Sequence, residues 1–168
     1  MDIDLFDAVE NNDAERVLAI LKRGVDANLR DTTGTTALHY AVINGNVRMV
    51  AMLIAHGADV NSRVEPVRTD PLNGSRSNWS VLQWAAEHNQ AECAQLLLDG
   101  GADIEAIDED GTTALYRSLD EVVGPDVARL LVSRGADINT ALDDGPVYIE
   151  KYQRFDILEK LINEFPQS

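Results

Sequence analysis

The chain has 168 residues, of which 45% are hydrophobic and 26% are charged, a composition typical of a folded domain and not of a disordered or fibrous chain. Its 29 acidic residues outnumber 14 basic ones and give a formal net charge of −15 at pH 7. A field of this sign repels nucleic acid and anionic membrane, and it raises encounter rates with basic proteins. The same charge could serve solubility alone.

The termini and the cysteine content bound the cellular context. Cys93 is the single cysteine, which excludes an intramolecular disulfide and fits a reducing compartment. The N-terminal residues Met1 to Asp4 lack the basic region and apolar run of a secretory signal, and no stretch approaches the roughly 18 apolar residues of a membrane span. We therefore expect a cytoplasmic protein that does not contact membrane and is monomeric when free.

A five-residue motif recurs along the chain. Gly24–Asn28 returns as Gly57–Asn61, as Gly101–Glu105 and as Gly135–Asn139. The glycines are 33 (24 to 57), 44 (57 to 101) and 34 (101 to 135) residues apart, so one unit of about 33 residues repeats with an insertion in the second interval. This period predicts a stacked solenoid, whose units bury their apolar faces against neighbours and leave the other surfaces free to bind.

Each unit follows one local pattern, which is clearest in the second. Asp31 and Gly34 mark a turn, and Thr36 stands where the N-cap of a helix is expected. A short first helix follows, and Gly45 is expected to close it in the left-handed conformation. The spacing of apolar residues then predicts a second helix over residues 47–55. Two antiparallel helices and a turn thus make one unit.

The residues at the start of each first helix identify a family. Thr36-Ala37-Leu38-His39 recurs as Ser80-Val81-Leu82-Gln83 and as Thr113-Ala114-Leu115-Tyr116. With the glycine motif, these segments resemble the ankyrin repeat family, whose signature is Thr-Pro-Leu-His, then alanines, a paired leucine and Gly-Ala-Asp-x-Asn. The chain departs from that signature at the proline position, and only His39 keeps the histidine. In the family this histidine bonds backbone groups across the turn.

The resemblance implies an all-α ankyrin-repeat solenoid of about five helix-turn-helix units in one domain over residues 1–168. The units cover residues 1–29 as an N-terminal cap, 30–62, 63–106, 107–140 and 141–168 as a C-terminal cap. An inserted loop over residues 64–78, rich in Pro, Gly, Asn and Ser, interrupts the third unit. A loop of this length either binds something or lacks a fixed structure.

Candidate chemical sites are few. Asp108 to Gly111 suggests a calcium loop, but Arg117 would then occupy the position that requires a bidentate glutamate. His39, His56 and His88 lack zinc-binding spacing, and Cys93 stands in an apolar stripe with no cation in the local sequence to activate it. No nucleophile or phosphate-loop motif is present in the sequence. We therefore expect no catalytic residues, no metal and no cofactor.

In the ankyrin family, partners contact the turn tips and the exposed side of the first helices. Transferred by position, the implied partner-binding residues are Thr33, Thr35 and Asn44 in the second unit, Trp79, Trp84, Glu87 and His88 in the third, Glu109, Asp110, Asp120 and Glu121 in the fourth, and Asp143 and Asp144 in the fifth. We expect Trp79 to point outward to a partner, whereas Trp84 either packs between units or contributes to the same surface. The expected face has an aromatic centre and an acidic C-terminal half.

The sequence thus indicates a non-enzymatic protein that binds a basic protein partner and not nucleic acid. Its size, charge and resemblance suggest an immunity or inhibitor protein directed against a basic bacterial toxin. The alternative is a scaffold or adaptor that links two partners without inhibiting either. Only scattered carboxylates favour an enzyme, and these are abundant in any acidic chain.

Overall fold

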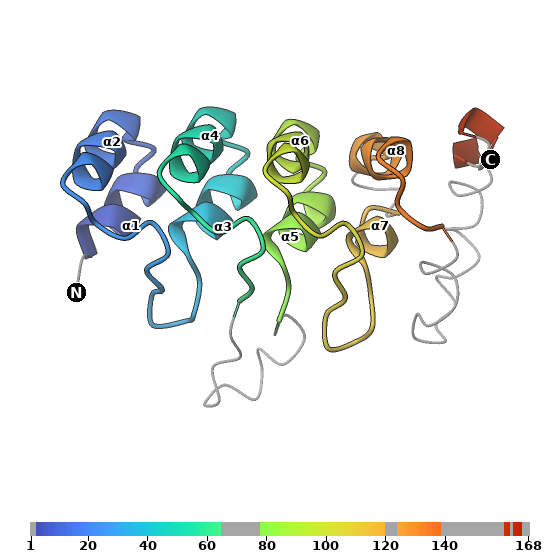
Figure 1. The fold of residues 1–168 in the computed structure, drawn as a ribbon, viewed down its shortest axis with the longest axis horizontal. Coiled ribbons are helices and arrows are strands. Elements are labelled where there is room, and N and C mark those ends of the chain that lie inside the picture. The colour runs from blue at the N-terminus through green and yellow to red at the C-terminus, as the bar shows by residue number, and fades with distance from the viewer. Residues whose placement is uncertain (1–2, 65–77, 120–123, 139–159, 162, 166–168) are drawn as a thin grey trace.

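The computed structural model describes residues 3–64, 78–119, 124–138, 160–161 and 163–165. Within these ranges the chain forms helices joined by turns, with two isolated β-bridges and no β-strand, as the all-α prediction requires. The helices pair into four consecutive hairpins (Figure 1). Their bounds are α1 (Ile3–Glu10), α2 (Ala14–Lys22), α3 (Ala37–Ile43), α4 (Val47–Ala55), α5 (Val81–Glu87), α6 (Ala91–Asp99), α7 (Ala114–Arg117) and α8 (Asp126–Ser133).

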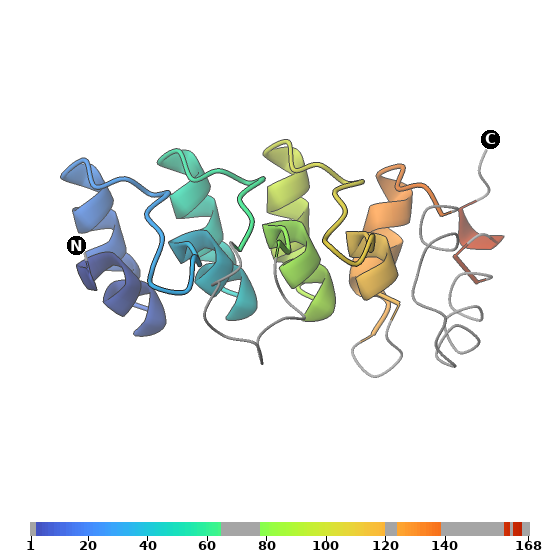
Figure 2. The same ribbon diagram turned by 90° about the horizontal axis from the view of Figure 1, so that it is seen from below.

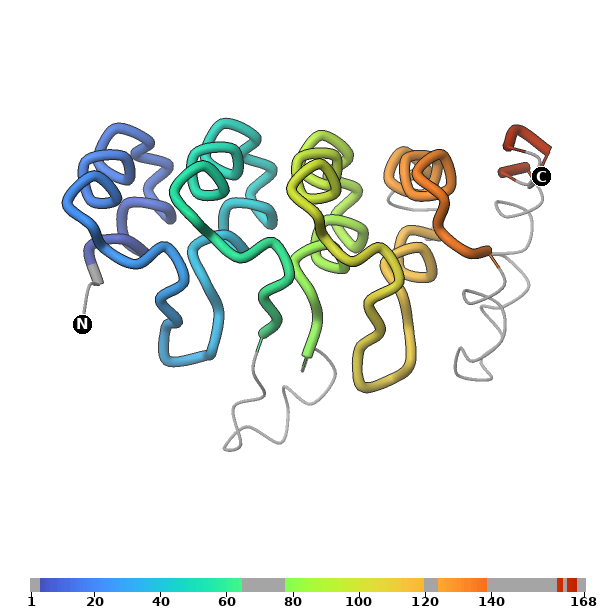
Figure 3. The backbone as a smooth tube through the Cα atoms, viewed as in Figure 1, coloured from blue at the N-terminus to red at the C-terminus, as the bar shows by residue number. Residues whose placement is uncertain are grey.

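The hairpins stack side by side in two layers. Helices α1, α3, α5 and α7 form an inner row in which each contacts the next, and α2, α4, α6 and α8 form an outer row (Figure 1). The view from below shows the same order of hairpins along the long axis (Figure 2). The turns that precede α3 and α7 extend to one side of both rows (Figure 3). The predicted solenoid is therefore confirmed for the described hairpins.

The second unit shows why these residues fold as helices. Thr36 is the N-cap of α3, and both its backbone N–H and its hydroxyl bond to Nδ1 of His39, at 3.3 and 2.8 Å. Gly45 ends the first helix with φ of +63°, a conformation that costs a residue with a Cβ atom about 1–2 kcal/mol. The Asn46 side chain accepts from the Met49 N–H and caps α4. Both predicted helices are confirmed.

Equivalent residues cap the next two inner helices. Ser80 and Gln83 bond reciprocally, since the Ser80 N–H donates to Gln83 Oε1 at 2.8 Å and the Gln83 N–H donates to Ser80 Oγ at 3.2 Å. In the fourth unit the Tyr116 N–H donates to Thr113 Oγ1 at 3.2 Å. The position three residues after the N-cap thus holds His39, Gln83 or Tyr116. The side chain at this position therefore differs between units, although the N-cap residue takes part in a capping hydrogen bond in each of the three helices.

The core repeats with the sequence period. Leu38, Leu82 and Leu115 hold the same place in successive inner helices and are each about 1% exposed. Leucines in the outer helices recur at Leu53, Leu97 and Leu131, 44 and 34 residues apart against 44 and 33 in the inner helices, and are fully buried. Each described hairpin packs against the next, so the stack is stabilised by contacts between neighbours.

The ends of the insertion pair with each other. The Val64 N–H donates to the Trp79 carbonyl at 3.0 Å, and the Asn78 N–H donates to the Val64 carbonyl at 2.8 Å. The loop predicted over residues 64–78 therefore leaves and re-enters the stack at one place, while its residues 65–77 lie outside the described part of the chain. Most of the predicted fifth unit, residues 141–168, also lies outside it, and the unit boundaries remain predictions.

Candidate functional site

The turn of the second unit is organised by one carboxylate. Asp31 accepts from the backbone N–H groups of Thr33 and Thr35 at 2.7 and 3.0 Å and from the Tyr40 hydroxyl at 2.7 Å. Burial alone would raise the pKa of Asp31, but these hydrogen bonds outweigh it and hold the pKa below its ordinary value. The hydroxyl of Thr33 also lies 2.6 Å from Asp31 and 2.8 Å from the Thr35 hydroxyl. The two predicted contact threonines thus serve the turn itself, Thr33 being exposed and Thr35 half-buried.

The fourth unit repeats this arrangement, with the guanidinium of Arg117 in place of the Tyr40 hydroxyl. Asp108 accepts from the Thr112 N–H at 2.9 Å and from the Thr112 hydroxyl at 2.7 Å. Arg117, nine residues on as Tyr40 is from Asp31, donates through Nε at 3.1 Å and through Nη2. Gln83 of the preceding unit adds a 3.2 Å bond. Burial would raise the pKa of Asp108, but the bonds from Arg117 and Thr112 hold it below its ordinary value.

Trp79 does not face a partner, which corrects the expectation from the sequence. Its side chain is covered on two sides, by Trp84 at 5.2 Å between ring centroids and by the Arg117 guanidinium at 3.4 Å from its ring centroid. The residue is only 3% exposed. Trp79 holds the position before the N-cap, and the fourth unit supplies the arginine that covers it. Because Arg117 lies 38 residues later in the sequence, local patterning around Trp79 gave no sign of this contact.

The rest of the aromatic group is also largely enclosed. Trp84 is buried, as the alternative of packing between units predicts, and its ring stacks on His88 at 5.7 Å with an interplanar angle of 20°. His88 caps the end of α5 and is half-buried, with Nδ1 3.0 Å from the Trp84 carbonyl. Glu87 is half-buried, and its Oε2 lies 4.0 Å from Nη1 of Arg117. Of the predicted aromatic centre, His88 and Glu87 therefore remain the residues with accessible surface.

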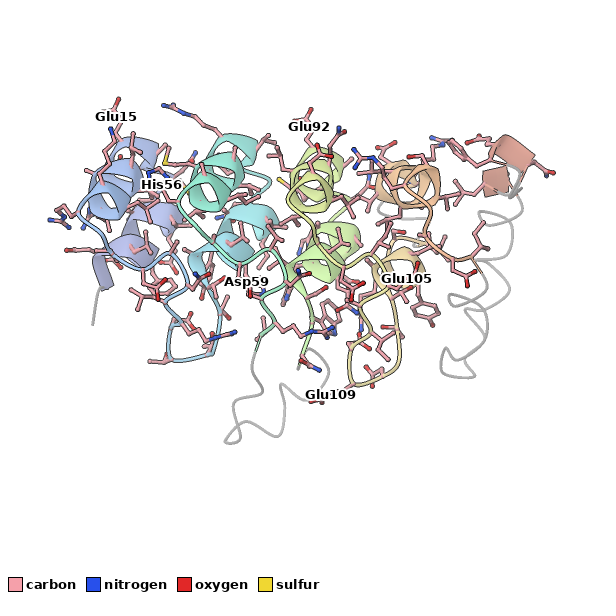
Figure 4. The ribbon with its side chains drawn as sticks, in the orientation of Figure 1. Glu15, His56, Asp59, Glu92, Glu105 and Glu109 are labelled. Atoms are coloured by element: carbon pink, nitrogen blue, oxygen red, sulfur yellow. The ribbon has the colours of Figure 1, made fainter. Side chains whose placement is uncertain are left out.

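The acidic part of the predicted face is partly described. Glu109 and Asp110 are exposed at the tip of the fourth-unit turn, where Glu109 extends to the lower edge of the molecule (Figure 4). Asn44 is exposed at the end of α3, away from this tip. Four further acidic residues of the predicted face lie outside the described part of the chain: Asp120, Glu121, Asp143 and Asp144.

A row of side chains that the sequence analysis missed connects the turns. Arg30 Nη1 donates to the Gly34 carbonyl of its own turn at 2.7 Å and to the Arg63 carbonyl of the next unit at 2.6 Å. Arg63 Nη1 repeats the pattern, donating to the Asn78 carbonyl at 3.0 Å and to the Ile107 carbonyl at 2.7 Å. We call Arg30, Arg63 and Ile107 the pre-turn row. Their spacings of 33 and 44 equal those of the repeated glycines, which is the signal that could have revealed the row.

An open pocket of about 750 Å³ lies between the first two hairpins, at the C-terminal ends of α1 and α3. It is lined by apolar residues, amides and charges of both signs: Val9, Glu10, Asn12, Ala14, Ala41, Asn44, Gly45, Asn46, Val47, Arg48 and Met49. Asn46 donates to Asn12 across it. Within the described residues, no three His, Cys, Asp or Glu side chains are grouped so as to hold a metal ion.

Two buried titratable groups complete the description. Burial and the charge of Arg30 lower the pKa of His39 to about 4, so the ring is neutral at physiological pH. Its Nδ1 accepts from Thr36, which confirms that His39 bonds backbone in the turn, and the Trp79 carbonyl acts in the opposite direction on its pKa. Burial, with a smaller contribution from Glu92, raises the pKa of the Cys93 thiol to about 11. Cys93 is therefore the buried, unreactive thiol that the sequence indicates.

Comparison with known families decides the identity of these repeats. A family model described as ankyrin repeats (3 copies) matches residues 5–108 and 62–141, which together cover most of the chain. The chain belongs to the ankyrin repeat family. The predicted family and the solenoid of ankyrin hairpins are thus both confirmed, and the pre-turn row and the turn carboxylates lie on the ankyrin turns.

Several curated ankyrin proteins are similar to this chain. The human "Ankyrin repeat and SOCS box protein 6" is 36% identical over 132 residues, which cover 75% of this chain and 29% of that protein. The chicken "Nuclear factor NF-kappa-B p105 subunit" is 30% identical over 145 residues, covering 84% of this chain and 14% of that protein. "E3 ubiquitin-protein ligase KEG" of Arabidopsis thaliana is 34% identical over 113 residues, or 67% of this chain and 6% of that protein. The chain spans less than a third of the length of each.

The ankyrin assignment sets the general function. Ankyrin repeats are protein–protein interaction modules, and the family is typically non-enzymatic. None of the described helices is long and apolar enough to cross a membrane. Of the predicted contact residues, Thr33, Asn44, Glu109 and Asp110 are exposed in the structure.

Proposed function

We propose that this ankyrin chain is a non-enzymatic module that captures a basic protein on its turn tips and the accessible edge of its inner helices. The observation that supports this most directly is the exposed pair Glu109 and Asp110 at the tip of the fourth-unit turn. The net charge of −15 extends the same preference over the whole molecule and accelerates encounter with a positively charged partner. Acidic residues at the edge of an interface chiefly set the association rate and exclude wrong partners.

Within this class, the narrower proposal is stoichiometric inhibition. A small, strongly acidic ankyrin protein suits the role of an immunity or inhibitor protein that binds a basic toxin and covers its functional surface. Support comes from the charge, the size and the shared use of ankyrin repeats in protein binding. The free protein is proposed to be a monomer, because inhibition by this route needs one exposed face for each partner molecule.

The test begins with identification of the partner by pull-down with the tagged chain and mass spectrometry, followed by titration calorimetry with the purified pair. The affinity is expected to fall as the ionic strength rises, because exposed charges are screened beyond about 10 Å at 0.1 M salt. Activity assays on the partner then separate inhibition from simple binding. An affinity that is indifferent to salt, or a partner without excess positive charge, would contradict capture led by charge.

A matched pair of charge variants locates the contact. Glu109→Gln with Asp110→Asn removes two negative charges from the fourth-unit tip, whereas Glu15→Gln with Glu92→Gln removes two from the outer-helix side (Figure 4). The net charge changes equally in both, so a general field effect would weaken binding equally. We expect the tip variant to lose about tenfold more affinity than the outer variant, a difference of about 1.4 kcal/mol. Equal losses would remove the turn tips from the proposal.

A second function is supported by a different observation. The curated relatives carry their similar segment within much longer chains, including proteins named as E3 ubiquitin-protein ligases, in which it covers 4% or 6% of the length. This favours a scaffold or adaptor that positions two proteins without inhibiting either. In that case the partner's activity should be unchanged in the complex, and a second protein should bind while the tips are occupied. Full inhibition at one-to-one stoichiometry, with no second partner, would favour the inhibitor.

A further inference from the structure

The third residue of the pre-turn row is apolar, whereas the first two are arginines. Arg30 and Arg63 each place a guanidinium across two carbonyl groups, one in their own turn and one in the following unit. The equivalent residue of the fourth unit is Ile107, which has no donor to make either bond. Its own carbonyl still accepts from Arg63, so the backbone at Ile107 is bonded to the preceding unit although its side chain makes no such bond.

The Ile107 side chain lies open to solvent. It is 55% exposed, and among the described residues it is the one large apolar side chain in that condition. A scattered exposed apolar residue needs no explanation. Ile107 differs because it occupies a position that holds arginine in both preceding turns. The substitution removes a cation from this tip and adds an apolar surface.

The exposed residues that follow Ile107 in its turn are acidic. Glu109 and Asp110 follow in the same turn and are both exposed, whereas the side chain of Asp108 is 1% exposed. The tip therefore presents one exposed apolar side chain beside two exposed acidic residues. The tip of the second unit offers the opposite combination, with Arg30 before the turn and the neutral Thr32 and Thr33 within it.

We propose that the fourth-unit tip, formed by Ile107, Glu109 and Asp110, is the primary docking point for the protein partner, and that it recognises a segment in which an apolar side chain stands next to lysine or arginine. The inference rests on the proposed capture of a basic protein and specifies where the contact is made. The apolar side chain packs on Ile107 while the cations pair with the two carboxylates at its edge, an arrangement common to energetically important interface residues. The guanidinium groups of Arg30 and Arg63 repel the same segment from the earlier turns, which sets the register.

The direct test uses synthetic peptides and the full chain. The first peptide carries a leucine between two lysines in a Gly/Ser background, the second replaces the leucine with serine, and the third replaces the lysines with glutamates. Amide chemical shifts in ¹H–¹⁵N NMR spectra are followed during titration. We expect the first peptide to shift resonances of residues 107–111 and to bind about tenfold more tightly than either control peptide. Equal binding of all three, or shifts centred elsewhere, would overturn the proposal.

Substitutions at residue 107 provide the matched comparison. Ile107→Arg restores the residue type found at the two preceding turns, so the fold should persist, as thermal unfolding can verify. It is nevertheless expected to weaken the leucine–lysine peptide at least about tenfold, because it removes the apolar surface and adds a like charge. Ala51→Arg adds the same charge to the exposed side of α4 and should leave binding within about twofold of the unmodified chain. Equal affinity of Ile107→Arg and Ala51→Arg would refute docking at this tip.

The same variants separate this inference from the proposed function. If an identified basic partner binds Ile107→Arg as tightly as the unmodified chain, docking at the fourth-unit tip is wrong while capture of a basic protein stands. If no basic protein binds the unmodified chain, both proposals fail. Loss of the full partner with Ile107→Arg and retention with Ala51→Arg would support both.

Discussion

The guanidinium carbon of Arg117 lies over the ring of Trp79, 3.4 Å from its centroid, although the two residues belong to different units. The same guanidinium pairs with Asp108, whose side chain is 1% exposed, while that of Arg117 is 12% exposed. One side chain thus joins the indole of the third unit to the turn carboxylate of the fourth. The contact is largely shielded from water, so both its charge pairing and its cation–π component are stronger than at an open surface.

Replacement of Arg117 should destabilise this junction. Arg117→Met keeps the packing on Trp79 but leaves the Asp108 carboxylate buried without its cation, and we expect a loss of about 2–4 kcal/mol in the free energy of unfolding measured with urea. The double variant Arg117→Met/Asp108→Asn removes the stranded charge and should recover part of this loss. If the single and double variants unfold alike, the ion pair is not the source of the coupling.

Trp79 should behave as a core residue. Trp79→Ala is expected to lower the free energy of unfolding by about 3–5 kcal/mol, because it opens a cavity between Trp84 and Arg117. Trp79→Phe keeps an aromatic face for the arginine and should cost less. Urea unfolding followed by circular dichroism measures both. If the Trp79→Ala protein had unchanged stability but failed to bind its partner, Trp79 would instead be the exposed contact residue that the sequence suggested.

The sequence predicted the architecture well because its evidence is local and repeated. The cap at Thr36, the turn at Gly45 and the bounds of α4 follow from residues within a few positions of each other, and the glycine period fixes their stacking. Family membership then located the turn tips, and Glu109 and Asp110 are exposed there as expected.

The candidate face was harder to predict because its surface is decided by contacts between units. Trp79 is buried by an arginine that lies 38 residues later, and Ile107 becomes notable only when compared with Arg30 and Arg63 in earlier units. Neither relation is visible in a window of neighbouring residues. The second relation is visible when the repeats are aligned by position, whereas the contact of Arg117 with Trp79 depends on how the third and fourth units pack together.

Protonation of His39 should make stability depend on pH. Its pKa is about 4 in the folded chain, chiefly through burial and the nearby Arg30, with Asp31 acting in the opposite direction, against 6.5 as the ordinary value. Between these values the unfolded chain binds a proton that the folded chain does not, so this contribution is complete above pH 6.5 and is lost as the pH falls towards 4. The expected loss is about 2–3 kcal/mol in the free energy of unfolding.

His39→Gln is the matched variant for that measurement. Gln83 holds the same position in the third unit and accepts from the N-cap backbone N–H at 2.8 Å, so glutamine can preserve the cap without titrating. Because carboxylates titrate in both proteins, the informative quantity is the difference between their unfolding free energies at each pH. This difference should narrow, or favour the variant, as the pH falls from 6.5 to 4. A constant difference across that range would contradict the depressed pKa.

Cys93 should resist thiol reagents while the stack is folded. Burial raises its pKa to about 11, so at neutral pH the thiolate fraction is about a hundredfold below that of an ordinary cysteine, and access is blocked as well. Ellman's reagent should therefore react at least about a hundredfold more slowly with the native protein than with the protein in denaturant. Comparable rates would mean that the hairpin of α5 and α6 opens readily. The denatured sample provides the reference for full reactivity.

The pre-turn row joins units in one direction only. Each arginine reaches forward to a main-chain oxygen, and every amino acid supplies that oxygen whatever its side chain. A unit can therefore exchange the side chain it displays before its turn while its N-terminal neighbour stays bonded to it. At this position the backbone carbonyl bonds to the preceding unit, while the side chain is available for recognition. The side chain at a tip can therefore change without loss of the bond to the preceding hairpin.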